Sequence, residues 1–357
     1  MRKRYYALII LLILCLLLPM DALAHKGRTD GNGGHKDSKN QSGLGGYHYH
    51  HGMGPHLHPN GICPYDSDKK QETPKQESPK AETPKNPPTA SSVNGELLIV
   101  YLDVGQADSV IILLPNGEFM LIDAGETNSN SYIIDFLKGM GEAFKSTGKI
   151  TLDYVIATHP HFDHISSMTQ VLKTFDVKNV YMPDVTHTSK AFANLIDVID
   201  KKGLDINIAQ AGKVLFDYGN LRAEFLAPVG SGYSDLNDFS AVLMLTYNDR
   251  RFLFMGDAGK ISENEILAAG YNISADVIKI GHHGGDEGST RAFIQKVAPK
   301  YAVISCGFLN EYGHPSENVL ATLKGINVFR TDRVGDVLVV YNGAGDMSVT
   351  ASITNFE

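Results

Sequence analysis

Cysteine is scarce in this 357-residue sequence, and its scarcity excludes one route to stability. Of the three cysteines, Cys15 lies in an N-terminal apolar run, so a chain cleaved after that run would keep only Cys63 and Cys306. Two cysteines cannot supply the disulfide framework that holds many small secreted domains together. Cys306 follows the apolar run 301–305 and is predicted to be a small buried hydrophobic residue. We therefore expect the fold to rest on a hydrophobic core.

Basic residues are outnumbered over most of the chain. Residues 96–357 contain 20 lysines and arginines against 32 aspartates and glutamates, a net charge of −12. Proteins that hold a long stretch of nucleic acid normally present a basic surface, because they neutralise backbone phosphates. The composition therefore argues against a long nucleic-acid groove. It leaves room for a local basic patch that includes Lys279, Arg291, Lys296, Lys300 and Arg330.

The N-terminal apolar run is too short for a comfortable membrane span, which needs about 20 residues. Arg2, Lys3 and Arg4 precede the apolar residues 7–20, and Ala22-Leu23-Ala24 forms an A-x-A cleavage site. This pattern is typical of a secretory signal peptide. We predict that residues 1–24 are a signal peptide and that the protein is secreted, either free outside the cell or associated with the cell wall. No membrane span is expected after cleavage.

Residues 25–65 are rich in histidine, glycine and asparagine and contain almost no aliphatic side chains. Such a segment cannot build a hydrophobic core. The run 47–51 (YHYHH) resembles the short His-rich module called YHYH, and an additional bound metal would explain how it orders. His51 stands where that module has a cysteine, and a flexible metal-scavenging tail is the equally weighted alternative. The segment contains His25, His35, His48, His50, His51, His56, His58 and Cys63.

Proline, lysine and glutamate dominate residues 66–94, which are predicted to be an extended, disordered linker. Strands and helices alternate over residues 95–357, a pattern that predicts one large α/β domain with two sheets covered by helices. A turn is expected at Pro115-Asn116-Gly117. Helices are expected over 131–137, 163–175, 192–202 and 262–269.

The run His159-Pro160-His161-Phe162-Asp163-His164 directly follows the apolar strand predicted over 152–157. In an extended segment, residues two apart point to the same side, so His159 and His161 can bind one ion. Asp163 and His164 enter the next helix, where Asp163 can cap the helix start while both turn toward a second ion. The spacing therefore predicts a site for two metals.

This arrangement resembles the metallo-β-lactamase-fold hydrolases, which implies an αββα sandwich with two divalent metal ions. In that family a later strand supplies a bridging carboxylate, here Asp257 in Gly256-Asp257, and another supplies a last histidine. His283 is the favoured ligand of the pair His282-His283, which places His282 beside the substrate, although the sequence leaves the two roles open. Asp123, which follows a second predicted strand, is expected to orient a ligand.

Several runs resemble the hydrolase domain of the competence protein ComEC more closely. These are Leu102-Asp103-Val104-Gly105-Gln106-Ala107-Asp108-Ser109, 121–125, 237–240, 313–315 and 330–332, with Ala107 where that family has glycine. The resemblance implies Asp238 as the third ligand of the first metal, with Asn237 as the fallback. An oxygen ligand favours manganese or magnesium beside zinc. His187 is expected to be a solvated loop histidine, and Lys279 to extend its ammonium to solvent from a strand.

Two divalent ions lower the pKa of a bridging water toward neutrality, and phosphate oxygens suit such a site. The leading hypothesis is a secreted phosphodiesterase or nuclease acting on extracellular DNA, with Asp163, His282 and His314 as catalytic residues. An alternative is a phosphodiesterase acting on a cell-surface polymer or small phosphoester, as in choline-phosphate esterases. A second alternative is a non-catalytic metal-binding surface protein. The oligomeric state is not predicted.

Overall fold

The computed structural model describes residues 34–36, 47–49 and 92–352, and the chain divides into two compact units, 1–77 and 78–357. In the first unit, the short strands β1 (Gly34–Lys36) and β2 (Tyr47–Tyr49) pair antiparallel, with His35 opposite His48. The predicted signal peptide, the rest of the His-rich segment and nearly all of the predicted linker lie outside the described residues.

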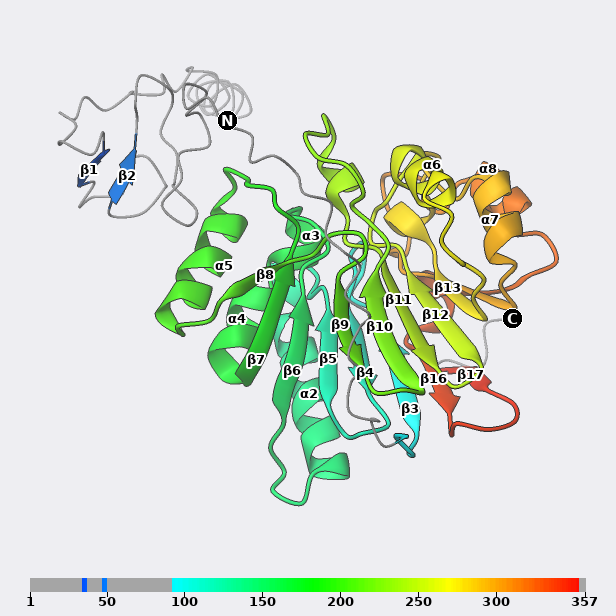
Figure 1. The fold of residues 1–357 in the computed structure, drawn as a ribbon, viewed down its shortest axis with the longest axis horizontal. Coiled ribbons are helices and arrows are strands. Elements are labelled where there is room, and N and C mark those ends of the chain that lie inside the picture. The colour runs from blue at the N-terminus through cyan, green and yellow to red at the C-terminus, as the bar shows by residue number, and fades with distance from the viewer. Residues whose placement is uncertain (1–33, 37–46, 50–91, 353–357) are drawn as a thin grey trace, which may run out of the picture. The chain divides into compact units, whose positions relative to one another are not determined.

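Two mixed β-sheets make up the centre of the second unit (Figure 1). The eight-stranded sheet has the order β17 (Ser348–Ala351), β16 (Val337–Tyr341), β3 (Leu97–Tyr101), β4 (Val110–Leu113), β5 (Phe119–Ile122), β6 (Thr151–Ile156), β7 (Asp176–Met182), β8 (Ile206–Ile208). The seven-stranded sheet has the order β15 (Asn327–Arg330), β14 (Tyr301–Ile304), β13 (Val277–Lys279), β12 (Arg250–Phe254), β11 (Leu243–Tyr247), β10 (Leu221–Phe225), β9 (Val214–Asp217). Strands β5 to β8 run parallel to one another, and so do strands β12 to β15.

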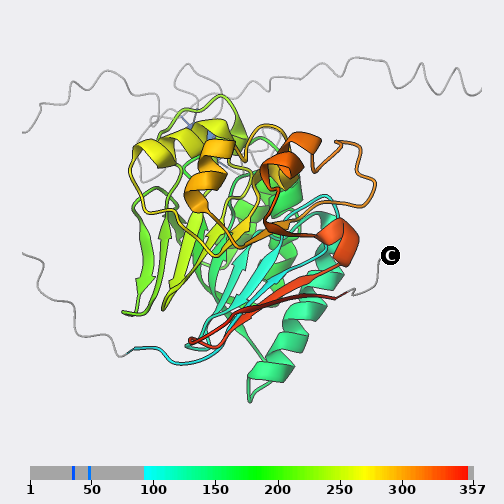
Figure 2. The same ribbon diagram turned by 90° about the vertical axis from the view of Figure 1, so that its right-hand side faces the viewer.

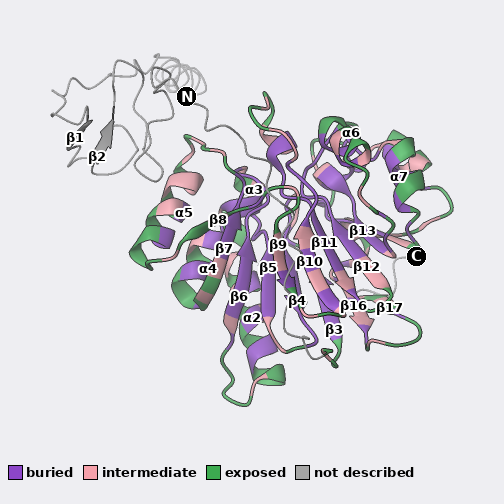
Figure 3. Cartoon of the chain, in the orientation of Figure 1, coloured by how far each residue is buried: buried purple, intermediate pink, exposed green. Residues whose placement is uncertain are grey.

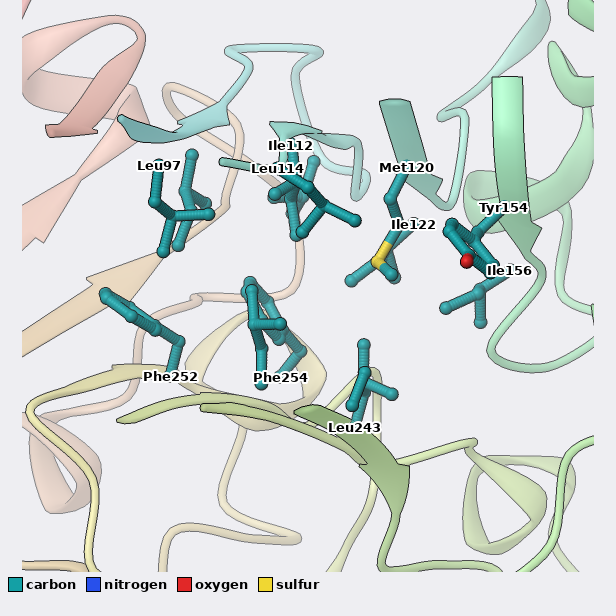
Figure 4. Packing of buried hydrophobic residues seen from close by; sticks show 14 of the residues in the cluster. Leu97, Ile112, Leu114, Met120, Ile122, Tyr154, Ile156, Leu243, Phe252 and Phe254 are labelled. Carbon is teal, nitrogen blue, oxygen red and sulfur yellow. The ribbon is translucent and has the colours of Figure 1, made fainter. Parts of the chain in front are cut away.

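The central strands β3, β4 and β5 are apolar and buried on both faces. In β12, Phe252 and Phe254 point into the core between the sheets, whereas Leu253 points to the opposite face. Figure 4 shows these two rings opposite Leu97 and Ile112 of the other sheet. Each such side chain contributes about 1.5–3 kcal/mol through its burial. Burial of these side chains between the sheets therefore stabilises the strands whose ends carry the site.

Helices cover the outer face of each sheet, which confirms the predicted αββα sandwich (Figures 1 and 2). Apolar side chains of α2 (Asn130–Phe144), α4 (Met168–Thr174) and α5 (Lys190–Lys201) pack on the outer face of the eight-stranded sheet. Three others cover the seven-stranded sheet: α6 (Lys260–Ala268), α7 (Arg291–Val297) and α8 (Glu317–Thr322). Figure 3 shows buried strands between helices whose outer faces are exposed. Within the described ranges, no helix is long and apolar enough to cross a membrane.

The helix predicted over 163–175 is interrupted. The chain forms α3 (Phe162–Ile165), turns, and then forms α4. At the turn, Ser167 donates its backbone N–H to Gly125 and its hydroxyl to the carbonyl of Glu126, which ties it to the loop after β5. The loop after β5 thus accepts the hydrogen bond of a backbone N–H that a continuous helix would have paired within itself. Cys306 is fully buried, as predicted.

Candidate metal centre

The predicted ligands gather where parallel strands of the two sheets end. His159 and His161 follow β6, Asp257 follows β12, and His283 lies in the short 3-10 helix η4 (Gly281–Gly284) after β13. In open α/β sheets, ligands bind at the carboxyl ends of the strands, where loops meet. The sandwich brings two such edges together.

Four side chains, Asp163, His164, Asp257 and His283, place one ligand atom each within 4.8 Å of one another. Nε2 of His283 lies 3.1 Å from Oδ2 of Asp163 and 3.5 Å from Oδ2 of Asp257. Nε2 of His164 lies 3.2 Å from the same Asp257 oxygen and 3.6 Å from Oδ2 of Asp163. The structure therefore brings together four of the residues predicted to bind metal.

His159 and His161 lie beside this group. Their Nε2 and Nδ1 atoms are 2.9 Å apart, and Nε2 of His159 is 3.9 Å from Oδ2 of Asp257. The same Asp257 oxygen therefore lies within 4 Å of nitrogens from His159, His164 and His283. This is the position that a carboxylate shared by two ions would occupy.

Hydrogen bonds behind the ligands fix the direction of the imidazoles. Nδ1 of His164 donates to Oδ2 of Asp123 at 2.8 Å, and Asp123 also accepts from the backbone N–H and hydroxyl of Thr158 at 2.8 and 2.7 Å. Nδ1 of His283 lies 3.0 Å from the carbonyl of Ser305, to which it can donate. In both rings Nε2 then faces the other ligands. Metal-binding histidines are usually oriented in this way, by a hydrogen bond from the ring nitrogen that does not bind the metal.

Lys279 does not reach solvent, contrary to the expectation from the sequence. It is 1% exposed, and its ammonium pairs with the buried carboxylate of Asp108 and donates to the carbonyl of Gly256 at 3.1 Å. Asp108 also places Oδ1 3.4 Å from Nδ1 of His283. Sequence reasoning missed both residues as parts of the site. The available signal was a lysine between Ile278 and Ile280 in a strand buried on both faces, where a charge needs a partner.

Asp238, the predicted third ligand of the first metal, is not in either group of clustered ligand atoms among the described residues. It lies in the 3-10 helix η3 (Leu236–Phe239), where its backbone carbonyl accepts from the hydroxyl of Ser262 at 3.3 Å. Burial raises the pKa of Asp238, and so do the carboxylates of Asp235 and Glu265. Its role as a metal ligand stays a prediction.

His282 and His314 form the mouth of the site. Nε2 of His282 is 3.9 Å from Oδ2 of Asp257, and its Nδ1 is 3.3 Å from Glu287. The rings of His282 and His314 have centroids 5.4 Å apart, and Nδ1 of His314 lies 3.3 Å from Nε2 of Gln106. Residues 103–108 therefore contribute to the site through Gln106 and Asp108. Only the glycine at 105 in this turn has a positive φ, so alanine at 107 is unstrained.

The carboxylates shift the pKa values of the histidines between them. Burial alone would lower the pKa of His283, but Asp257 and Asp108 raise it to about 10. The pKa of His164 is also raised, by Asp257 in particular, against the effect of burial. Burial lowers the pKa of His159, which favours the neutral form that ligates metal. The same carboxylates that raise the pKa of His164 and His283 would also stabilise a divalent cation beside these rings.

The donor set fits divalent ions. Nε2 of His164 and Oδ1 of Asp257 are buried and have no hydrogen-bond partner among the described residues. Buried polar atoms of this kind are costly unless something satisfies them. Mixed imidazole and carboxylate ligands suit zinc and also manganese. The structure therefore provides candidate ligand groups for metal and leaves the identity of the metal open.

Replacing His283 by alanine is expected to remove one bound ion, because its Nε2 belongs to the clustered ligand atoms. Replacing His282 by alanine should leave both ions bound, because its ring is partly exposed and its Nδ1 faces Glu287 at 3.3 Å, whereas His159, at the same 3.9 Å from Oδ2 of Asp257, is fully buried. Metal per protein after dialysis, measured by elemental analysis, checks both variants. Loss of an ion from the His282 variant alone would exchange the two roles.

Comparison with known proteins gives matches over the part of the chain that carries this site. The family model described as Metallo-beta-lactamase superfamily matches residues 102–307. The chain is 31% identical over 268 residues to ComE operon protein 3 of Bacillus subtilis, covering 70% of this chain and 34% of that protein. It is 26% identical over 243 residues to Competence protein ComA of Neisseria gonorrhoeae, covering 67% and 32%. The chain thus spans about a third of the length of these relatives.

Among solved structures, the metallo-beta-lactamase fold protein YhfI from Bacillus subtilis matches 72% of this chain and 100% of its own chain. The TM-score is 0.44 and the sequence identity is 11%.

Proposed function

We propose, from the premise that the chain belongs to the metallo-beta-lactamase superfamily, that it is a dinuclear metal-dependent hydrolase of phosphodiesters, acting on extracellular DNA. The single observation that carries the proposal is the position of Asp257. Its Oδ2 lies within 4 Å of nitrogens of His159, His164, His282 and His283, which follow strands of two different sheets. One carboxylate oxygen shared among so many imidazoles is suited to two cations.

The proposed ligands are His159 and His161 for the first ion and Asp163, His164 and His283 for the second, with Asp257 shared and Asp238 as the predicted further ligand. When bound, the two ions supply Lewis-acid chemistry that activates water near neutral pH and stabilises negative charge on phosphate oxygens. Asp123 and the Ser305 carbonyl hold the imidazoles in position.

His282 and His314 are the residues proposed to act on the leaving group. Both lie at the mouth of the site and are partly exposed, so a substrate can reach them. Glu287 faces Nδ1 of His282 at 3.3 Å, which directs Nε2 of that ring toward Asp257 and the place of reaction. An imidazole in this position can donate a proton to a departing alkoxide. Asp163, the third predicted catalytic residue, contributes through its contact with His283.

Exposed aromatic side chains beside the site support a nucleic-acid substrate. Phe162 lies within the histidine motif and is 51% exposed, while Phe308 and Tyr312 are 65% and 66% exposed. The Tyr312 ring has its centroid 5.8 Å from that of His314. Aromatic side chains stack on unpaired bases with about 1–3 kcal/mol per base. Lys279 is buried, so the basic patch that the sequence suggested loses one member. With less positive charge to neutralise backbone phosphates, the ends of DNA strands suit this surface better than a long duplex does.

Action outside the cell rests on the N-terminal sequence pattern. The charged start, the apolar run 7–20 and the A-x-A site support secretion, with the cell wall as one destination. The His-rich residues 25–65 support an additional metal site separate from the hydrolase domain.

A phosphodiesterase acting on a cell-surface polymer or a small phosphoester is the second candidate. The net charge of −12 over residues 96–357 favours it, because a polyanion is repelled by an acidic surface. Glu287 and the exposed Glu311 near Tyr312 add negative charge at the mouth. A cationic alcohol such as choline would find both carboxylates and an aromatic face there.

Release of nucleotides from linear DNA tests the proposal. Purified protein with added manganese or zinc is expected to release nucleotides, and chelation of the metal should stop the release. Bis-p-nitrophenyl phosphate, a small phosphodiester, is assayed in parallel. Hydrolysis of this compound without cleavage of DNA would move the assignment to the second candidate, and inactivity on both would contradict phosphodiester hydrolysis.

A further inference from the structure

His314 is held by two loops that come from different sheets. Its own loop, residues 305–316, follows β14 of the seven-stranded sheet, and Gln106 lies in the loop after β3 of the eight-stranded sheet. Asn310 donates its side-chain amide to the carbonyl of His314 at 2.6 Å and accepts from the backbone N–H of His314 at 2.9 Å. Gln106 contacts the ring itself. The backbone and the ring of His314 are therefore fixed by different partners.

The partners of the Gln106 side chain determine how its amide is turned. Oε1 of Gln106 accepts from the backbone N–H of Gly307 at 2.9 Å, and Nε2 of Gln106 lies 3.3 Å from Nδ1 of His314. The opposite orientation would place the NH2 group against the N–H of Gly307, which is also a donor. A side chain at position 307 would prevent this approach, because its Cβ would lie 2.8 Å from the backbone nitrogen of Gln106. The amide of Gln106 thus faces the imidazole with its NH2 group.

This contact decides which nitrogen of His314 carries the proton. The NH2 group of Gln106 can only donate, so Nδ1 of His314 must accept and carries no proton of its own. The proton of the neutral ring then lies on Nε2. A doubly protonated ring would place an N–H on Nδ1 against the amide donor, so the same contact disfavours the imidazolium. His283 shows the opposite arrangement, because its Nδ1 faces the carbonyl oxygen of Ser305.

Nε2 of His314 faces the mouth of the site. A Cβ at position 285 would lie 2.8 Å from this nitrogen and 2.5 Å from Oε2 of Glu287, so glycine at 285 keeps the space beside Nε2 open. The φ of Gly285 is −67°, a value that any residue adopts, so the backbone does not require glycine there. The ring of His282 borders the same place, with its centroid 5.4 Å from that of His314. A phosphate group that enters the mouth can therefore meet the N–H of Nε2.

We infer that Gln106 is a positioning residue that holds His314 as a neutral imidazole with its proton on Nε2, and that His314 donates a hydrogen bond to a phosphate oxygen of the substrate. The inference rests on the proposed function and gives its two histidines at the mouth different roles. A neutral imidazole that gave up its proton would become an imidazolate anion, so His314 keeps the proton throughout. Transfer of a proton to the leaving oxygen is then left to His282.

Nitrogen-15 NMR of the histidine rings measures the position of the proton, because a ring nitrogen without a proton resonates far downfield of a protonated one. The full chain is loaded with zinc, which is diamagnetic, and is measured at about pH 8, above the ordinary histidine pKa of about 6.5. In wild type, Nδ1 of His314 is expected to give the unprotonated signal and Nε2 the protonated one. The His314→Gln variant identifies these two signals by their loss.

Gln106→Glu is the variant that tests the positioning role. Glutamate has nearly the same shape as glutamine, so one carboxylate oxygen can still accept from the N–H of Gly307, while the other faces Nδ1 of His314 and favours a proton there. The unprotonated signal of Nδ1 should therefore disappear. Gln210→Glu makes the same change at an exposed position and should leave both signals of His314 in place. An unprotonated Nε2 in wild type, or an Nδ1 signal that Gln106→Glu does not alter, would overturn the inference.

Turnover of a dinucleotide, a phosphodiester with an alkoxide leaving group, separates hydrogen bonding from proton transfer. Glutamine places its side-chain N–H close to the position of Nε2 in histidine but cannot act as an acid, so His314→Gln should lose at most about tenfold in kcat. His314→Ala removes the donor and should lose about a hundredfold or more. Equal losses in both variants, or no loss in either, would contradict the hydrogen-bond role. A wild type that hydrolyses no phosphodiester would contradict the proposed function, and the NMR spectra would still decide where His314 carries its proton.

Discussion

Replacement of Asp257 by asparagine is expected to abolish hydrolysis and to lower the metal content of the protein. Asparagine has nearly the same shape, so the backbone contact of residue 257 with Ser240 should persist. The substitution removes the charge from the oxygen that lies within 4 Å of His159, His164 and His283. Metal ions contribute several kcal/mol of transition-state stabilisation, so activity should fall at least about a thousandfold. Turnover of bis-p-nitrophenyl phosphate and elemental analysis measure both effects.

Asp346→Asn is the matched control for this variant. Asp346 lies on an exposed turn before β17, and the same chemical change there should leave turnover and metal content at wild-type values. Unchanged turnover in Asp257→Asn would contradict the two-metal mechanism. Loss of activity with full metal content would instead assign Asp257 a role in catalysis without a role in binding.

Replacement of Lys279 by methionine is expected to destabilise the protein by about 3–5 kcal/mol, because removing one member of a buried ion pair leaves the other charge uncompensated. Lys279 is 1% exposed, and Asp108, its partner, is buried as well. Methionine has a similar unbranched shape and keeps the packing. Urea denaturation of metal-free protein gives the change in the free energy of unfolding.

Two further variants show whether the buried charge is the cause. Asp108→Asn combined with Lys279→Met removes both charges and should recover at least half of the lost stability. Lys178→Met breaks an ion pair of 2.6 Å with Asp153, but Lys178 is 60% exposed, so the loss should be at most about 1 kcal/mol. A Lys279→Met variant as stable as Lys178→Met would show that the buried pair has no structural importance.

The local pattern of the sequence determined the elements that carry the site. Apolar strands followed by polar residues predicted β6, β12 and β13, and the ligands begin where these strands end. The histidine motif predicted that His159 and His161 would lie together, and their nitrogens are 2.9 Å apart. These predictions succeeded because they depend on side-chain direction within one segment.

Contacts between distant segments were beyond the reach of such patterns. The break between α3 and α4 depends on the loop after β5. The pairing of Lys279 with Asp108 joins a strand of one sheet to a loop of the other. The approach of His187 to His161, with ring centroids 6.4 Å apart, depends on β6 and β7 being neighbours in the sheet. Each involves residues that are close only after the sheets have formed.

The sequence alone therefore determined the αββα architecture and the segments that carry the candidate ligands, because hydrophobic periodicity and motif spacing are local properties of the chain. The tertiary structure alone decided which charges are buried and which residues orient the ligands. The physical reason is that burial and charge pairing depend on packing between segments, and two sheets that face each other place side chains together without regard to their separation in sequence.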